Sequence, residues 1–426
     1  VYVAFRNRAW PRNEPVLRDL LQRRYQLAQT LGYQNYAVMI TEDKMIGSPA
    51  RASAFIDQLS NLARPAAQRD YGVLLNRLQE INRRARAVPA WDTSYLTQLV
   101  QTEDYALNPQ EVRQYFAYNN VRDGILQLTE DLFRVDIRPW RDAPKWDPSV
   151  EAYELYDGGR LIGRFYLDMH PRDGKYSHAA QFTIRNGIQG RAVPVAALIC
   201  NFPTGGHDTG LMEHSDVETF LHEFGHLLHN VFSGRVPYAA ANMGEIEWDF
   251  IEAPSQLLEE WVWDYETLRR FAVNAQGQPI PQDLVARMNR ARFFGEGVGV
   301  MTQLGYANVS LGFYNRNPSG MDLNTAYTTG FERYAVVDVA PGTHMYASFG
   351  HLDGYSAIYY TYQWSRAIAF DLFTAFETSG LRDAATAQRY RETVLAPGGS
   401  APANTLITRF LGRPSNVDAY ARRLRE

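Results

Sequence analysis

The sequence predicts a mostly α-helical protein with one small antiparallel β-sheet, an α+β fold. Residues 1–135 carry apolar side chains at helical spacing, residues 150–202 change to short apolar runs between glycine-rich turns, and the rest returns to helical spacing. The chain has 426 residues, of which 45% are hydrophobic and 21% are charged. A chain of this size and composition buries a large core and divides into more than one structural lobe.

The composition excludes some classes of protein. A formal net charge of −4 leaves no basic excess to neutralise a phosphate backbone, so we expect no nucleic-acid partner. No apolar run reaches the roughly 18–20 residues that a membrane span requires. The single cysteine, Cys200, favours a reducing, cytoplasmic location. A periplasmic or exported location stays open, because the chain begins at Val1 without an initiator methionine.

A helical lobe is expected over residues 1–140. Its clearest helix start is Asn108, with proline at the first helical position and Glu111 three residues after the cap, and the stripe that follows runs to Leu132. Earlier helices are expected over 13–31, 48–64, 65–87 and 93–106. Apolar stripes of this kind form core, so the lobe itself shows no chemistry.

A small, mostly antiparallel sheet is expected over residues 141–213. Short apolar runs at 152–156, 161–167, 178–184 and 193–200 are separated by turns that contain glycine. An unpaired sheet edge can bind an extended peptide as an added strand. The segment Val195–Phe202, just before the next helix, is the candidate for such an edge, and an ordinary buried strand is the equal alternative.

The segment Ser215–Gly234 contains the pattern His-Glu-x-x-His at His222, Glu223 and His226. On a helix the two imidazoles project from one face, one turn apart, with a carboxylate beside the first. A catalytic zinc ion requires this arrangement from a helix. The sequence therefore predicts a metal site here.

The same helix has predicted ends. Ser215 and Glu218 form an expected capping box, and Gly234 is expected to end the helix in the left-handed conformation. With nine histidines in the chain, the motif arises by chance in about one chain in a hundred. A buried polar helix without metal is therefore the alternative interpretation.

A hydrolytic zinc takes three protein ligands, so a third must come from another segment. Residues 248–264 are predicted to form a helix, with Pro254 tolerated in its first turn. Glu252 and Glu259 are seven residues apart and share a face of that helix. Glu252 is the natural third ligand, and Glu259 can accept a hydrogen bond from a ligand imidazole. The alternative is that both glutamates are solvated, although their apolar neighbours argue against it.

Two segments make the sequence resemble a known family. HEFGHLLH at His222–His229 and DFIEAPSQLLEEW at Asp249–Trp261 are similar to the thimet oligopeptidase family of zinc metallopeptidases, family M3, which includes neurolysin-like and bacterial dipeptidyl-carboxypeptidase members. The likeness extends to Ile162–Ala180 and Phe349–Ser365. The resemblance implies a zincin-type metallopeptidase with a deep substrate channel, lined on one side by the lobe at 1–140.

The resemblance also implies roles for individual residues. One Zn²⁺ ion per chain is held by His222, His226 and Glu252. Glu223 is the general base, and Glu259 is the carboxylate that orients a ligand imidazole. The helical catalytic region that carries these residues is expected over 214–426.

Tyr355, Tyr359 and Tyr362 fall on one face of an expected helix that follows His351. An aromatic stripe at this spacing more often packs in a protein core than binds a substrate. Family members use a glycine-rich loop and a tyrosine-rich helix on the substrate, so the resemblance implies Tyr362 as the oxyanion donor. It implies the other three side chains as substrate contacts. The loop HLDGY at 351–355 is one residue shorter than the usual family pattern.

The predicted function is hydrolysis of internal bonds of short unstructured peptides by a monomeric zinc peptidase. A dipeptidyl carboxypeptidase that releases C-terminal dipeptides is one alternative, and a non-catalytic peptide-binding protein with the same fold is another. Family members carry a further helical portion ahead of the point where this chain starts. A separate or removed N-terminal segment of the same protein is therefore an expected partner.

Overall fold

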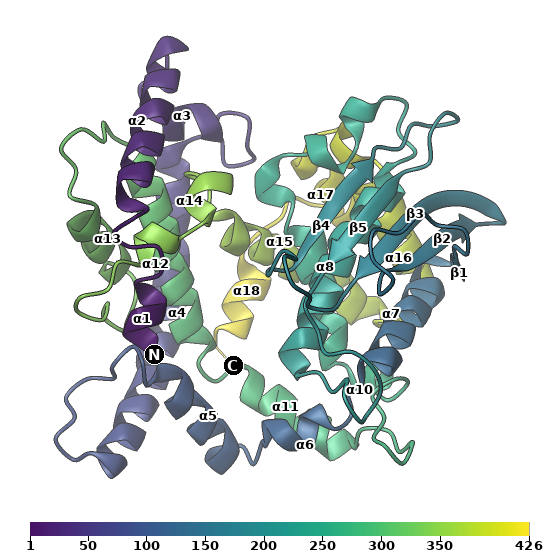
Figure 1. Cartoon of the computed structure of the whole chain (residues 1–426), viewed down its shortest axis with the longest axis horizontal. Helices are drawn as coiled ribbons and strands as arrows, with labels where there is room; N and C mark the ends of the chain where they lie inside the picture. Colours follow the sequence, from purple (N-terminus) through teal and green to yellow (C-terminus); the bar gives the residue numbers. More distant parts are fainter. Residues whose placement is uncertain (426) are drawn as a thin grey trace. The chain divides into compact units, whose positions relative to one another are not determined.

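The computed structural model describes residues 1–425 and confirms a mostly helical α+β fold with one small sheet (Figure 1). The chain forms two compact units. Unit 1 consists of Val1–Ala106, Arg290–Trp364 and Ala421–Glu426, and unit 2 consists of Leu107–Asn289 and Ser365–Tyr420. The division into regions 1–140, 141–213 and 214–426 stays a prediction. Within the described residues, no helix combines the length and the apolar character needed to cross a membrane.

Unit 1 is entirely helical in its regular structure. Its helices are α1 (Tyr2–Arg6), α2 (Glu14–Thr30), α3 (Tyr36–Thr41), α4 (Pro49–Ile81), α5 (Thr93–Asp104), α12 (Glu296–Tyr314), α13 (Leu323–Glu332), the 3₁₀ turn η5 (Met345–Ser348) and α14 (His351–Gly354). Three helices cross the boundary between the units: α11 (Gln282–Arg292), α15 (Thr361–Ser379) and α18 (Asp418–Arg423).

Two of the predicted helices in unit 1 are in fact one. Helix α4 continues through Pro65, so the predicted boundary between 48–64 and 65–87 is wrong. A proline removes one backbone hydrogen bond, but here the helix packs along α12. At Gly297 of α12, an added Cβ would lie 2.4 Å from the backbone nitrogen of Ala67. The absence of a side chain at Gly297 lets the two helices pack closely across the proline.

Unit 2 contains the sheet and the helices around it. Its α-helices are α6 (Pro109–Arg113), α7 (Tyr118–Phe133), α8 (His214–Ser233), α9 (Ala253–Leu258), α10 (Tyr265–Leu268), α16 (Ala384–Tyr390) and α17 (Ala403–Leu411). Short turns are η1 (Ala239–Ala241), η2 (Met243–Glu245), η3 (Trp248–Phe250), η4 (Glu259–Trp263), the π-turn η6 (Arg391–Leu395) and η7 (Gly398–Ser400). The predicted start at Asn108 is confirmed, since its side chain accepts from the Gln110 amide, but that helix ends after five residues and α7 begins separately.

The five strands are β1 (Asp136–Pro139), β2 (Glu151–Asp157), β3 (Arg160–Asp168), β4 (Ala180–Arg185) and β5 (Val195–Ile199). Their order is β1-β2-β3-β5-β4, and every pairing is antiparallel except that of β3 with β5. The strand in Val195–Phe202 is therefore not an edge, and the alternative prediction of an ordinary buried strand is confirmed. It is internal because the chain returns from β4 to pair between β3 and β4. Among the described residues, the edge beside β5 is formed by β4.

The two faces of the sheet are covered differently. Helix α8 packs on one face, where Phe165 of β3 meets Phe224 edge-on. An added Cβ at Gly163 would lie 2.3 Å from Val231, so glycine allows the helix to approach the strand. The other face carries a core cluster with Val150, Ala152, Tyr166, Val195 and Ala197, on which Trp140 and Ala143 pack. Alternation of side chains along each strand assigns every residue to one of these faces.

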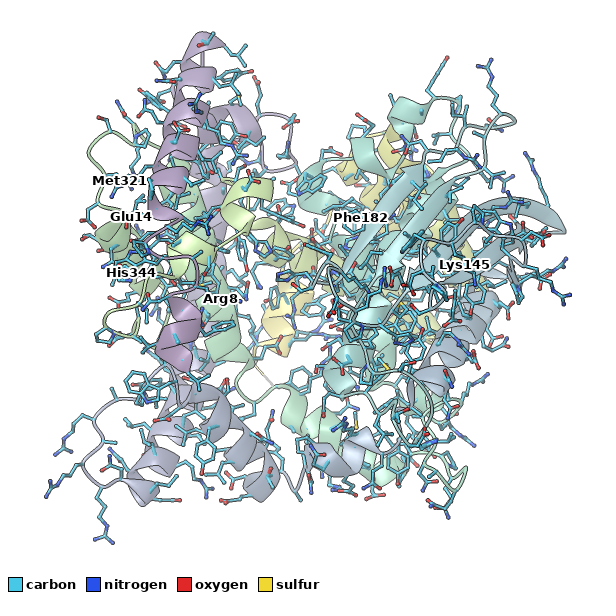
Figure 2. The ribbon with its side chains drawn as sticks, in the orientation of Figure 1. Arg8, Glu14, Lys145, Phe182, Met321 and His344 are labelled. Atoms are coloured by element: carbon cyan, nitrogen blue, oxygen red, sulfur yellow. The ribbon has the colours of Figure 1, made fainter. Side chains whose placement is uncertain are left out.

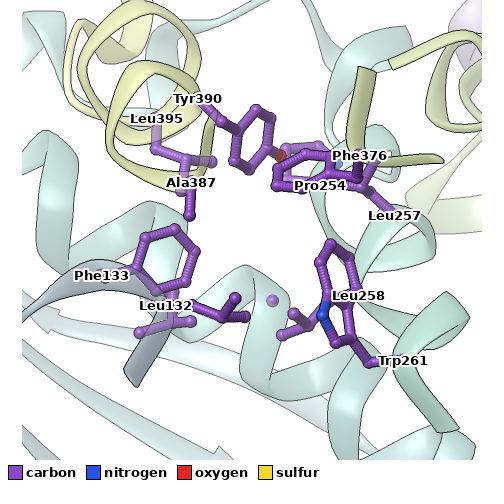
Figure 3. Close-up of a pocket in the computed structure, with 12 residues that line it drawn as sticks. Leu132, Phe133, Pro254, Leu257, Leu258, Trp261, Phe376, Ala387, Tyr390 and Leu395 are labelled. Carbon is purple, nitrogen blue, oxygen red and sulfur yellow. The ribbon is translucent and has the colours of Figure 1, made fainter. Parts of the chain in front are cut away.

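Helix α8 also packs closely on α9. A Cβ added at Gly225 would lie 2.6 Å from Cα of Ser255 and 3.0 Å from the carbonyl oxygen of Pro254. Figure 3 shows the apolar cavity of about 10 Å³ beside this contact, lined by Leu132, Phe133, Pro254, Trp261 and Tyr390 among others. Since the neighbouring atoms at Gly225 belong to the backbone, they cannot rotate away from a side chain. Gly225 therefore fixes the distance between the two helices.

The loop from β3 to β4 is held by a buried carboxylate. Asp168 accepts hydrogen bonds from the Trp146 indole at 2.8 Å and from both terminal nitrogens of Arg172, at 2.6 and 2.8 Å. Its Oδ1 lies 3.0 Å from Nζ of Lys175, whose side chain is also buried and donates to the carbonyl oxygen of Cys200. The network joins the ends of β3 and β5 to the loop that leads into β4.

The close contact at Gly225 predicts the effect of a single methyl group. Gly225→Ala is expected to lower the free energy of unfolding by about 2 kcal/mol, because backbone must move to admit the Cβ. The matched control is Gly299→Ala in α12, where nothing lies within 4 Å of the added atom. Gly299→Ala is expected to raise the free energy of unfolding by up to about 1 kcal/mol, because alanine favours a helix over glycine. Urea unfolding measures both, and equal effects would contradict the assignment.

Asp168 predicts a pH dependence of stability. Burial would raise its pKa, but the hydrogen bonds from Arg172, Trp146 and Lys175 outweigh burial and lower the pKa to about 2 from 3.8. A lowered pKa in the folded state contributes stability above pH 4, about 2 kcal/mol here, and this is lost as the pH falls from about 4 to 2. Urea unfolding of the unmodified chain and of Asp168→Asn measures this contribution. The difference in free energy of unfolding between the two should shrink as the pH falls from about 4 to 2. Asp173→Asn, an exposed change in the same loop, should follow the unmodified chain.

Candidate metal centre

The helix that carries the His-Glu-x-x-His motif begins and ends differently from the prediction. The capping box of α8 is formed by Glu213 and Asp216, not by Ser215 and Glu218. The Asp216 side chain accepts from the amide of Glu213 at 2.9 Å, which a carboxylate does more strongly than a neutral hydroxyl. At the other end Gly234 has φ −70°, so the expected left-handed conformation is wrong. A Cβ at Gly234 would instead meet Pro194 at 2.4 Å, so close packing explains this glycine.

The three expected ligand side chains meet in unit 2. One oxygen of Glu252, Oε2, lies 3.1 Å from Nε2 of His222 and 3.1 Å from Nε2 of His226. The donor atoms of the three side chains all lie within 4.8 Å of one another. The Glu252 carboxylate is buried, with its side chain 4% exposed. Two imidazoles and one carboxylate thus converge on one point from two separate segments.

Glu252 and Glu259 are not on one continuous helix. The predicted helix over 248–264 is broken into η3, α9 and η4, with Glu252 as the residue before α9 and Glu259 as the first residue of η4. Pro254 lies in the first turn of α9, as predicted. The broken path still brings both carboxylates to His222, because Oε1 of Glu259 accepts a hydrogen bond from Nδ1 of this histidine at 2.6 Å.

The contact with Glu259 determines which nitrogen of His222 is available. A hydrogen bond from Nδ1 to a carboxylate keeps a proton on Nδ1, so in the neutral ring Nε2 is the nitrogen that carries the lone pair. Nε2 is the atom that faces Glu252 and His226. The geometry therefore directs the metal-binding nitrogen of His222 to the point where the other two donors meet.

These residues fit a divalent metal ion. Burial lowers the pKa of His222, but its hydrogen bonds to the carboxylates of Glu252 and Glu259 and their negative charge more than compensate and raise it. The two carboxylates thus stabilise positive charge at a buried site. Two nitrogen donors and one oxygen donor form the ligand set of many hydrolytic metal centres, with a fourth position left for water. A bound cation would supply the partner that the buried Glu252 carboxylate requires.

Glu223 lies beside the three donors but does not join them. Its side chain is 7% exposed, and burial raises its pKa, although His226 and His222 act in the opposite direction. The backbone amide of Gln181 in β4 donates a hydrogen bond to its carboxylate. A carboxylate with a raised pKa next to a metal site is a stronger base than an exposed carboxylate and is suited to accept and release a proton.

The third histidine of HEFGHLLH does not join the cluster. His229 is fully buried, and neither ring nitrogen has a hydrogen-bond partner within residues 1–425. Burial lowers its pKa to about 3, so the imidazole is neutral. Its ring packs edge-on against Phe250 of η3, two residues before Glu252. His229 therefore packs between α8 and the segment that delivers Glu252.

The predicted substrate residues gather in unit 1. Nε2 of His351 lies 3.2 Å from the Tyr362 hydroxyl, and the Tyr355 and Tyr362 rings stack with centroids 5.0 Å apart. The phenol of Tyr359 donates to Gln303 of α12. The expected continuous helix is wrong, since only Tyr362 lies on α15 and Ser356 has a positive φ of 44°. The turn at Ser356 follows the end of α14, yet the side chains of His351, Tyr355, Tyr359 and Tyr362 still lie together.

The sequence did not single out Gln181 or the edge position of β4. The run 178–184 was predicted as a strand, but the order of strands in a sheet depends on long-range pairing. No local pattern encodes which strand is left at the edge. Polar and apolar side chains alternate from Gln181 to Ile184, and this alternation is the one local pattern that indicates a strand with a solvent-exposed side.

Comparisons with known proteins agree with this architecture. The family model described as "Peptidase family M3" matches residues 1–426 of this chain. Thimet-like oligopeptidase of Dictyostelium discoideum is 31% identical over 96% of this chain and 64% of its own length. Oligopeptidase A of Salmonella typhimurium is 29% identical over 96% of this chain and 61% of its own length. The chain thus spans somewhat less than two thirds of these relatives.

Two solved structures share the fold. PZ peptidase A with inhibitor 2 superposes with a TM-score of 0.57 at 14% identity, over 97% of this chain and 64% of its own. An M32 carboxypeptidase from Deinococcus radiodurans R1 superposes with a TM-score of 0.58 at 13% identity, over 99% of this chain and 76% of its own. At these identities the likeness is one of fold.

The role of Glu259 predicts a graded loss of metal. Glu259→Ala should weaken metal affinity by about 10- to 100-fold, because Nδ1 of His222 loses its acceptor. His226→Ala removes a ligand and should weaken metal affinity further than Glu259→Ala does. Glu266→Ala, an exposed change on α10, is the control and should leave affinity unchanged. Titration against a chelating dye measures all three. Unchanged affinity in Glu259→Ala would contradict the orienting role.

Proposed function

The chain belongs to peptidase family M3, and we propose that it is a zinc-dependent peptidase that cleaves internal bonds of short unstructured peptides. The observation that carries this proposal is the convergence of His222, His226 and Glu252 beside the buried Glu223 carboxylate. A set of two imidazoles and one carboxylate is the donor set of several zinc hydrolases. A cytoplasmic location and a monomeric state stay predictions.

When bound, zinc would supply Lewis-acid activation of water and of the scissile carbonyl group. Its proposed ligands are Nε2 of His222, Nε2 of His226 and a carboxylate oxygen of Glu252. The hydrogen bond from His222 to Glu259 supports this assignment, since it orients the ring and fixes the tautomer.

The proton steps are assigned to Glu223. As the water oxygen attacks the carbonyl carbon, the Glu223 carboxylate accepts a proton from that water. It then donates the proton to the nitrogen of the leaving amine as the C–N bond breaks. The raised pKa that burial produces supports both roles, because a group that must accept and donate works best when its pKa is near the working pH.

The outer edge of β4 offers a means of holding the substrate. A peptide in extended conformation can pair with the outer side of this strand by backbone hydrogen bonds, independent of its sequence. The strand is next to the site, since the Gln181 amide contacts Glu223 and Thr183 accepts from Asn230 of α8 at 2.6 Å. Folded proteins do not present such a segment, which supports unstructured peptides as substrates.

Stabilisation of the oxyanion is assigned to Tyr362. A phenol that donates to the developing negative charge lowers the barrier selectively. The contact of its hydroxyl with Nε2 of His351 supports a defined orientation of the phenol. His351, Tyr355 and Tyr359 are proposed as substrate contacts around it.

The proton steps predict the phenotype of one substitution. Glu223→Gln should retain zinc but lose at least 10³-fold in kcat, since the amide cannot accept the proton; this is an order-of-magnitude expectation for removal of a general base. Hydrolysis of a quenched fluorescent peptide, with and without chelator, and metal analysis of the same samples provide the measurement. Full activity in Glu223→Gln, or activity that survives complete zinc removal, would sink the proposal.

Tyr362 predicts a different kinetic signature. Tyr362→Phe should lower kcat by roughly 10²- to 10³-fold with little change in KM and in zinc content, because the lost hydrogen bond forms mainly in the transition state. Tyr95→Phe, an exposed change in α5, is the control. An increase in KM at unchanged kcat would instead make Tyr362 a substrate contact. Peptides with free and amidated C-termini, cleaved in parallel, separate endopeptidase from dipeptidyl carboxypeptidase activity.

A further inference from the structure

An apolar row crosses the sheet on the face away from α8 and stops at the edge strand. Ala152 of β2 pairs with Tyr166 of β3, which pairs with Ala197 of β5, which pairs with Phe182 of β4. The first three side chains are buried, whereas Phe182 is 47% exposed. Figure 2 labels this side chain on unit 2. The row therefore ends on a large apolar side chain that solvent reaches.

A second apolar side chain lies beside Phe182. The pairing of β4 with β5 is irregular between Thr183 and Arg185, so Ile184 is an extra residue opposite Val195. A residue in this position keeps its side chain on the same face as its partner, which here is the face of Phe182. Ile184 is 53% exposed. We call Phe182 and Ile184 the apolar step.

Single exposed apolar side chains are common on protein surfaces, but the apolar step adjoins a third exposed side chain. The ring of Tyr176, 53% exposed, packs edge-on against Phe182 with centroids 6.1 Å apart. Over β2, β3 and β5 the same face of the sheet is covered. Trp140 packs on the core cluster there, and the centroid of the Trp146 ring lies 4.9 Å from that of Tyr166. One further strand beside β4 would extend the row of apolar side chains.

The opposite face of β4 lies at the candidate metal centre. Asn230 of α8 donates to Thr183, and the backbone amide of Gln181 contacts Glu223. A peptide added along the outer side of β4 would thus have its backbone beside Glu223. Its side chains would alternate between the α8 face and the face of the apolar step.

We propose that the apolar step selects substrates, favouring peptides with apolar side chains at two positions that are two residues apart. The inference rests on the proposed function for the identity of the occupant, an extended peptide. Cross-strand contacts between aromatic and aliphatic side chains favour pairing by up to about fivefold in binding for each pair. Polar side chains at the same positions would leave Phe182 and Ile184 solvated and gain no such contact.

Equilibrium binding tests the proposal without requiring cleavage. The protein is the zinc-loaded full chain with Glu223→Gln, and the probes are two fluorescein-labelled nonapeptides that carry either leucine or serine at alternate positions. We expect the leucine peptide to bind at least fivefold more tightly. Adding Phe182→Ser or Ile184→Ser should reduce this preference to about twofold or less, and fluorescence anisotropy measures each affinity. The matched control is Tyr238→Ser, which removes another exposed aromatic ring of unit 2 and should keep the preference.

The outcomes separate this inference from the proposed function. Equal affinity for the two peptides, no binding of either, or a preference that survives both serine substitutions would overturn the role of the step. Each of these results can occur whether or not the unmodified chain hydrolyses peptides. Absence of chelator-sensitive hydrolysis overturns the proposed function, while a leucine preference lost in Phe182→Ser would still support the step as a peptide-binding surface. Thermal unfolding verifies that the exposed substitutions leave the fold intact.

Discussion

The contact on which the site depends is the shared approach of one Glu252 oxygen to the Nε2 atoms of His222 and His226, 3.1 Å in each case. A carboxylate this deeply buried is unstable unless positive charge or hydrogen-bond donors compensate it. The two imidazoles supply donors, and a cation among the three side chains would supply charge. The packing of unit 2 keeps these groups in place, because Gly225 sets the distance between α8 and the segment that carries Glu252.

Helix α8 connects the metal centre to the surface that would receive a peptide. One side of it carries the imidazoles, and other residues of the same helix contact the sheet at Gly163, Phe165 and Thr183. The position of β4 relative to Glu223 is therefore fixed by the same helix that positions His222. The Asp168 network adds a second constraint, since it ties the loop before β4 to the ends of β3 and β5. Chemistry and peptide recognition thus share one scaffold.

Local patterns in the sequence predicted the fold class and the pairing of His222 with His226, because spacing along α8 determines which side chains share a face. They also singled out Glu252 and Glu259, although these two residues reach His222 by a broken path and not along one helix. They failed where tertiary contacts decide. Pro65 lies within α4 because packing along α12 outweighs one lost hydrogen bond, and Ser356 interrupts the expected tyrosine helix. The sequence could not decide whether Val195–Phe202 is an edge or a buried strand, since strand order arises from pairing between distant segments. Gln181 was missed for the same reason.

The proposed function requires that His222, His226 and Glu252 together hold one zinc ion. X-ray absorption at the zinc edge, on the chain loaded with one equivalent of zinc, tests it most directly. We expect two imidazole nitrogens near 2.0–2.1 Å with the remaining neighbours oxygen, and loss of one imidazole in His226→Gln. A sulfur neighbour near 2.3 Å, or two imidazoles that persist in His226→Gln, would contradict it.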